Sequence, residues 1–134
     1  MVEHIKKVCE VLKIELPTQE KDKSYSIEIT KDLEVKIFDL DPGFYFHANI
    51  IHLPDEKKED LFIYLMRANL LGQGTGRCRI GLDMEEKFLT LSYLIDYEVN
   101  YIEFKEKLED FTNYINYWKK EIILHIEKAR SSIL

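Results

Sequence analysis

A helical stretch that runs into closely spaced glycines is the feature that most constrains how this chain folds. Gly72, Gly74 and Gly76 end the stretch, and a short apolar strand with an acidic turn from Asp83 follows. Phosphate-binding glycine loops have the opposite order, because they leave a strand and open a helix whose amides meet the phosphate. A helix C-terminus instead carries free carbonyls and partial negative charge. The run therefore predicts a helix cap at Gly72 and a tight connection, not a nucleotide site.

The composition narrows the class of protein. A chain of 134 residues predicts a single domain over 1–134. The net charge of −6 argues against a nucleic-acid partner, which favours basic surfaces. No apolar run approaches membrane-spanning length, and the N-terminus lacks the apolar core of a signal peptide. Cys9 and Cys78 have apolar neighbours, so we interpret them as small hydrophobic residues of a reducing cytosol.

Alternation of apolar and polar residues predicts five strands, near 25–29, 33–37, 44–52, 78–82 and 88–95. The first three are predicted to form an antiparallel meander. In the third, one face carries Phe44, Phe46, Ala48 and Ile50. Before this strand, Asp41-Pro42-Gly43 has the proline and glycine of a type II turn.

Helical spacing of apolar residues predicts three helices. The first spans about 5–12, and the second follows Pro54 with Asp55 as its N-cap. The third begins at Asn100, with Glu103 completing a capping-box pattern, and runs to about residue 130. Its apolar stripe fits a helix packed on a sheet better than a coiled-coil seam. The order α-β-β-β-α-β-β-α predicts an α+β domain with a twisted antiparallel sheet flanked by helices.

The chain lacks the residue patterns of catalytic, cofactor or metal sites. None of the four histidines has the spacing of paired metal ligands. His47 and His52 would lie on opposite faces of a regular third strand. The carboxylates near Asp83 belong to a solvated turn, and no serine has the glycine neighbours of a nucleophile elbow. We therefore predict no catalytic residue, no cofactor site and no metal site, and a protein that is not an enzyme.

The stretch Ala68-Asn69-Leu70-Leu71-Gly72-Gln73-Gly74-Thr75-Gly76, with Ile80-Gly81-Leu82-Asp83, resembles the class I type III secretion chaperones, the family of the chaperones of Tir and YopE. That family has a helix ending in a similar asparagine–leucine–glycine-rich run, then a strand ending in glycine–leucine–aspartate. The resemblance extends to Leu89-Thr90-Leu91-Ser92, and to Phe111 and Trp118. Two segments depart from it: Arg77-Cys78-Arg79, where the family often has smaller or apolar residues, and an apolar tail from Ile122 to Leu134.

The resemblance implies a homodimer in the bacterial cytoplasm that acts without a cofactor. Each dimer would wrap the N-terminal segment of a secreted effector protein in extended form, and hold it ready for the secretion ATPase. Two other functions remain open: a non-enzymatic subunit that pairs with a folded partner through its last helix, and a small-ligand-binding domain.

A dimer interface is implied for the second helix and the fourth strand. The wide apolar arc of the second helix suits such an interface. The implied interface residues are Leu61, Phe62, Leu65, Met66, Cys78 and Ile80. Burial in the core of the same chain explains each of them equally well.

Two features of such a domain can bind an extended peptide: an exposed strand edge, and a groove between the first helix and the sheet. The predicted effector-binding residues are Val8 and Leu12 on the helix, and Tyr45, His47, Asn49 and Ile51 on the outer face of the third strand. A solvated sheet face has the same mixed character, so this alternative stays open.

Overall fold

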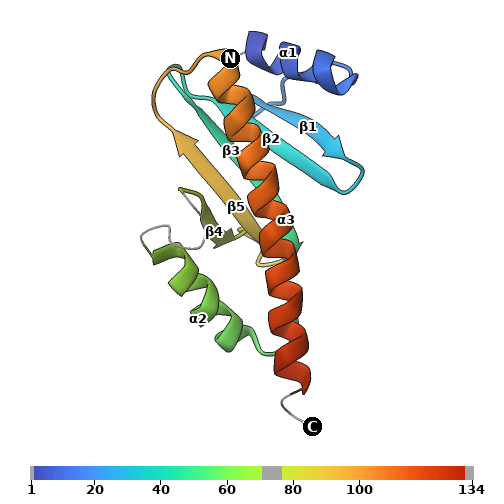
Figure 1. Ribbon diagram of the computed structural model, residues 1–134, viewed down its shortest axis with the longest axis vertical. Helices are drawn as coiled ribbons and strands as arrows, with labels where there is room; N and C mark the ends of the chain where they lie inside the picture. The colour runs from blue at the N-terminus through green and yellow to red at the C-terminus, as the bar shows by residue number, and fades with distance from the viewer. Residues whose placement is uncertain (1, 71–76, 132–134) are drawn as a thin grey trace.

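The computed structural model describes residues 2–70 and 77–131 (Figure 1). Its elements follow the predicted order, which confirms the α+β class. They are α1 (Val2–Leu12), β1 (Ser24–Thr30), β2 (Leu33–Asp39), β3 (Phe44–His52), α2 (Lys58–Asn69), β4 (Arg79–Leu82), β5 (Phe88–Ile95) and α3 (Tyr101–Ser131).

The strands form one antiparallel sheet in the order β1-β2-β3-β5-β4. The predicted meander of the first three strands is confirmed, and β1 and β4 are the two edge strands. The long helix α3 crosses one face of the sheet, which we call the inner face (Figure 1). The helices α1 and α2 lie toward opposite ends of α3, α1 near its beginning and α2 near its end (Figure 1).

The core lies between the inner face and α3. The stripe of α3 is buried throughout, with exposures of 5% or less at Phe104, Leu108, Phe111, Ile115, Trp118 and Ile122. Phe104 contacts Phe44 and Phe46 edge-on, at ring-centroid distances of 5.2 and 5.7 Å. Such tilted aromatic contacts add to the energy of apolar burial. The stripe is thus used within its own chain, as expected for a helix packed on a sheet.

The ends of the helices agree only in part with the predicted caps. Asn100 caps α3, because its Oδ1 accepts the N–H of Glu103 at 2.8 Å. Asp55 does not cap α2: the helix starts at Lys58, and the N-cap is Lys57 with a φ of 59° and no side-chain cap bond. The predicted cap at Gly72 lies outside the described residues.

The turn between β2 and β3 depends on Gly43. Its φ is 90°, the left-handed value predicted for a glycine there, and the Asp41–Pro42 peptide bond is cis. A Cβ at this position would overlap the carbonyl group of Ile95 on β5. Both the backbone conformation and the close approach of β5 therefore require glycine.

We expect Gly43→Ala to lower the free energy of unfolding by at least about 2 kcal/mol, because it adds backbone strain to a backbone overlap. Urea unfolding measures this change. Gly81→Ala is the matched control: its Cβ would meet only Thr90 Oγ1 at 3.4 Å, so we expect a change below about 1 kcal/mol. Equal losses in the two variants would contradict this account.

Candidate functional site

An apolar groove lies between α1 and α3 and reaches β1. Val8 is buried, whereas the side chains of Val11 and Leu12 are 59% and 39% exposed. The groove has a volume of about 460 Å³ and is lined by Val8, Val11, Leu12, Ile29, Tyr101, Lys105, Leu108, Glu109, Thr112 and Asn113. Val8 and Leu12 are thus brought together. Sequence reasoning missed Val11, because it falls outside the core-facing stripe of α1, although an apolar residue off that stripe is itself a signal.

The free edge of β1 lies next to this groove, since Ile29 of β1 lines it. At the start of the edge, the carbonyl of Ser24 accepts the N–H of Glu20 at 2.8 Å. Backbone groups alternate along a strand, so those of Ser26 and Glu28 point the same way as those of Ser24, away from β2. A second groove of about 430 Å³ follows this edge, lined by Ile14, Glu15, Ser26, Glu28, Thr30 and Lys31.

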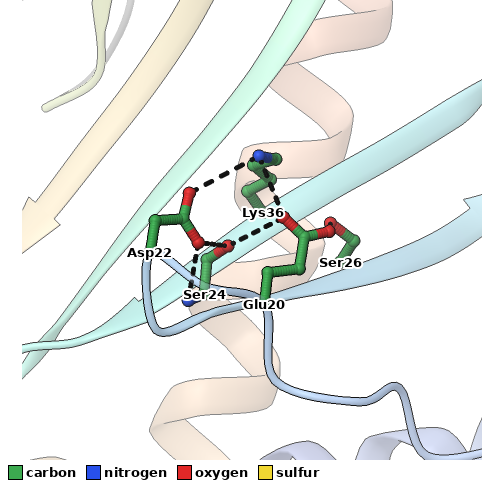
Figure 2. Close-up of polar contacts among 5 residues, drawn as sticks. All are labelled: Glu20, Asp22, Ser24, Ser26 and Lys36. Carbon is green, nitrogen blue, oxygen red and sulfur yellow. Dashed lines mark hydrogen bonds and ion pairs between the residues drawn. The ribbon is translucent and has the colours of Figure 1, made fainter.

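A polar network fixes the loop that precedes β1, as Figure 2 shows. Glu20 accepts a hydrogen bond from Ser26 Oγ at 2.9 Å, and Asp22 accepts the N–H and Oγ of Ser24 at 3.0 and 2.6 Å. The ammonium of Lys36 lies 3.2 Å from Glu20 and 3.6 Å from Asp22. The loop therefore covers the edge at Ser24 but leaves the next outward-facing residues accessible.

The same contacts shift the acidity of the three charged groups. The hydrogen bond from Ser26 and then Lys36 lower the pKa of Glu20, and the hydrogen bonds from Ser24 lower the pKa of Asp22. The hydrogen bond to Glu20 raises the pKa of Lys36. A carboxylate with a lowered pKa stabilises the folded loop above its unfolded pKa, and this contribution is lost as the pH falls through the folded pKa.

We expect Ser26→Ala and Lys36→Met each to raise the pKa of Glu20 toward its ordinary value, as followed by NMR titration of its side chain. The global free energy of unfolding should change little, because exposed ion pairs and exposed polar contacts contribute little to stability. Lys31→Met is the control and should leave the pKa unchanged. An unchanged titration of Glu20 in both test variants would contradict the network.

The outer face of the sheet carries the other predicted effector-binding residues. Tyr45 and His47 are half-buried and Asn49 is exposed. Burial chiefly, then the charge of Lys36, lower the pKa of His47. A recess of about 790 Å³ opens beside these residues, lined by Asp32, Glu34, Lys36, His47, Ala48, Asn49, Ile50, Ile51, His52, Phe88 and Lys119.

A bulge in β3 changes the expected faces of two residues. The pairing with β5 shifts between Asn49 and Ile51, so that Ile51 pairs with Leu89 and His52 with Phe88. Ile51 consequently packs against the core, and His52 joins His47 in the recess. His47 and His52 were predicted to lie on opposite faces if the strand were regular. The extra residue of the bulge reverses the alternation, so the two side chains lie on the same face.

The predicted effector-binding residues thus fall on two surfaces. Val8 and Leu12 line the groove beside α3, whereas Tyr45, His47 and Asn49 lie on the face that α3 leaves uncovered. The structure does not bring the two groups together.

The residues implied for a dimer interface are mostly buried within this chain. Leu61, Leu65, Cys78 and Ile80 have exposures of 1%, 4%, 2% and 8%. Phe62 is half-buried against the core, and Met66 is 72% exposed. Two further apolar side chains of this region, missed from the sequence, are exposed: Ile63 at 51% and Leu70 at 62%. Ile63, Met66 and Leu70 follow helical spacing, and we call them the α2 apolar face.

The helix α2 is attached to the last part of α3. Tyr64 donates a hydrogen bond to Glu121 at 3.0 Å and stacks on His125 with ring centroids 4.9 Å apart. Burial, and then the bond to Glu121, raise the pKa of Tyr64 to about 12. The C-terminal part of α3 therefore holds α2 in place.

Neither cysteine has the acidity of a reactive thiol. Burial raises the pKa of Cys9, and it raises the pKa of Cys78 to about 12. Within residues 2–70 and 77–131, no group of three or more histidine, cysteine or acidic residues could hold a metal ion. No helix in the same ranges combines the length and apolar character needed to cross a membrane.

Comparison with known protein families shows the family to which this chain belongs. The model of the Tir chaperone protein (CesT) family matches residues 13–119. The chain belongs to the Tir chaperone family. The sequence-based identification of a type III secretion chaperone that binds effectors is therefore confirmed. No curated protein matches the sequence.

Solved structures show the same fold at low sequence identity. A chain of the crystal structure of the ExsC–ExsE complex matches with a TM-score of 0.74 and 12% identity, over 88% of this chain and 90% of that one. A chain of the HopA1–SchA chaperone–effector complex matches with a TM-score of 0.65 and 11% identity, over 88% and 91%. A chain of the heterodimeric ExoU–SpcU complex from the type III secretion system of Pseudomonas aeruginosa matches with a TM-score of 0.64 and 11% identity, over 92% and 94%.

Proposed function

We propose that this chaperone binds an extended N-terminal segment of a secreted effector along the β1 edge and in the α1–α3 groove, and so keeps the effector ready for export. The observation that carries the proposal is that the α1–α3 groove and the groove along the β1 edge adjoin the same strand. Ile29 belongs to the groove, while Ser26 and Glu28 of the same strand line the edge. A segment paired with β1 could place apolar anchors against Val11 and Leu12.

The two surfaces supply different parts of the binding energy. Strand addition contributes backbone hydrogen bonds that do not depend on sequence, and the groove selects apolar side chains. Ordering a disordered segment costs about 2–5 kcal/mol, so a large contact area is needed. Known complexes of this fold, such as HopA1–SchA, contain a chaperone and an effector, which supports the same kind of partner here.

A homodimer would supply the additional contact area. The α2 apolar face is the exposed apolar surface on the helix that the family resemblance implicates, and a two-fold axis would bring two copies of it together. Two protomers can hold different stretches of one effector and so raise the effective concentration of the second contact. The dimer would act in the bacterial cytoplasm and deliver the segment to the secretion ATPase.

Val11→Asp tests the groove. The protein that co-purifies from the native bacterium is identified by mass spectrometry, and its protease-protected segment is synthesised as a fluorescent peptide. We expect Val11→Asp to weaken binding of this peptide at least tenfold, roughly, because a carboxylate would be buried without a partner. Fluorescence anisotropy measures the affinity.

Val2→Asp is the matched control for the groove, since Val2 is an exposed valine of the same helix, at 43%, and does not line the groove. Both variants should unfold at the wild-type temperature. Equal peptide affinities of Val11→Asp and the wild type would contradict the groove. Protection of a folded domain, in place of an extended N-terminal segment, would contradict the proposed function.

Met66→Asp tests the dimer. We expect light scattering to change from a dimer to a monomer, because two buried carboxylates would face each other across the two-fold axis. The folded monomer should be unaffected, since Met66 is 72% exposed. Met84→Asp is the control, because Met84 is fully exposed in the β4–β5 turn. A Met66→Asp protein that remains dimeric would exclude this face as the interface.

A further inference from the structure

The second edge of the sheet differs from the first. At the end of α2, the carboxamide of Asn69 reaches β4 and makes two hydrogen bonds to one residue. Its Nδ2 donates to the carbonyl of Ile80 at 2.7 Å, and its Oδ1 accepts the N–H of Ile80 at 2.8 Å. This donor-and-acceptor pair is what a residue of a neighbouring strand would offer to Ile80.

The backbone N–H and carbonyl of Ile80 point away from β5, toward the edge of the sheet that no other strand covers. The N–H of Ile80 is used by Asn69, so it does not point toward β5, although Ile80 is aligned with Leu91 in the ladder. Just before the strand, the carbonyl of Cys78 accepts a hydrogen bond from Arg79 Nη1 at 3.0 Å. Side chains therefore bond both the edge at Ile80 and the backbone that leads into it.

Too little of the β4 edge remains to pair with a strand. The strand spans only Arg79–Leu82, and its outward-facing residues by alternation are Ile80 and Leu82. With Ile80 occupied, Leu82 alone is left. At the β1 edge, by contrast, Ser26 and Glu28 are consecutive outward-facing residues that line an open groove.

We propose that Asn69 acts as a strand substitute that closes the β4 edge, so that strand addition is confined to β1. The excluded partner is any extended polypeptide, whether an effector segment or the β4 strand of a second copy. Asn69 is in this sense a positioning residue for peptide binding. The assignment of the β1 edge to effectors rests on the proposed function, whereas the closure of β4 does not.

Asparagine suits this position for a specific reason. Its amide offers a donor and an acceptor side by side, which aspartate and alanine do not. Asn69 is the last residue of α2, and its neighbour Ala68 is buried at 9% exposure. The amide is thus held by the helix end, and it links α2 to β4 at the same time.

Amide hydrogen exchange by NMR tests the closure without any effector. The measurements use the Met66→Asp background, so that the proposed α2 interface does not contribute. We expect Asn69→Ala to speed exchange of the Ile80 amide roughly tenfold or more, because an edge amide without a partner is open to water. Asn69→Asp should have a smaller effect, since a carboxylate still accepts the Ile80 N–H. Arg67→Ala, an exposed change in the last turn of α2, should have none.

A synthetic peptide of alternating threonine and valine, flanked by lysines, serves as the strand probe. We expect it to protect the amides of Ser26 and Glu28 in every variant, and those of Ile80 and Leu82 only in Asn69→Ala. If the alanine variant does not fold, Asn69→Ser replaces it with the same expectation.

Three results would overturn the proposal: unchanged Ile80 exchange in a folded Asn69→Ala protein, peptide protection of Ile80 in the wild type, or faster exchange at Ile80 with no peptide protection there. Missing protection of Ser26 and Glu28 in every variant would count against the proposed function, while the exchange rates of Ile80 decide the role of Asn69 separately.

Discussion

The packing of α3 on the inner face of the sheet determines where the other surfaces of this domain lie. Phe104 inserts against two phenylalanines of β3, and Trp118 and Ile122 are buried further along the same stripe of α3. Each such buried side chain contributes about 1.5–3 kcal/mol. Because one helix occupies this face, α1 and α2 pack near its two ends (Figure 1). The groove beside α1 and the exposed face of α2 are consequences of that arrangement.

The sequence predicted those parts of the fold that depend on local patterns. Strand alternation identified the buried face of β3, and the spacing of the α3 stripe identified the core-facing side of that helix. Asn100 was recognised as a cap because its side chain bonds to a backbone group only three residues away. The prediction that Asp55 caps α2 was wrong, because the chain bends between Pro54 and Lys57 and the helix starts only at Lys58.

The parts that could not be predicted depend on contacts between distant segments. The bulge in β3 is defined by its register with β5, and no residue pattern within 44–52 marks it. Asn69 belongs to the motif that carried the family resemblance, yet its bonds to Ile80 cross 11 positions of the chain. For the second helix, the apolar arc did not distinguish core residues such as Leu61 from exposed ones such as Met66.

A protein that pairs with extended peptides must expose a strand edge without joining its own copies edge to edge. In this chain the exposed part of β1 is short. The loop at Glu20 occupies Ser24, and a register shift between Glu28 and Thr30 ends the regular pairing with β2. Two outward-facing residues give only a few backbone bonds, so the edge alone holds a peptide weakly. Tight binding would then require apolar anchors in the adjacent groove, which a cognate segment supplies. The closed β4 edge adds to this selectivity, because it leaves no second place for pairing by backbone alone.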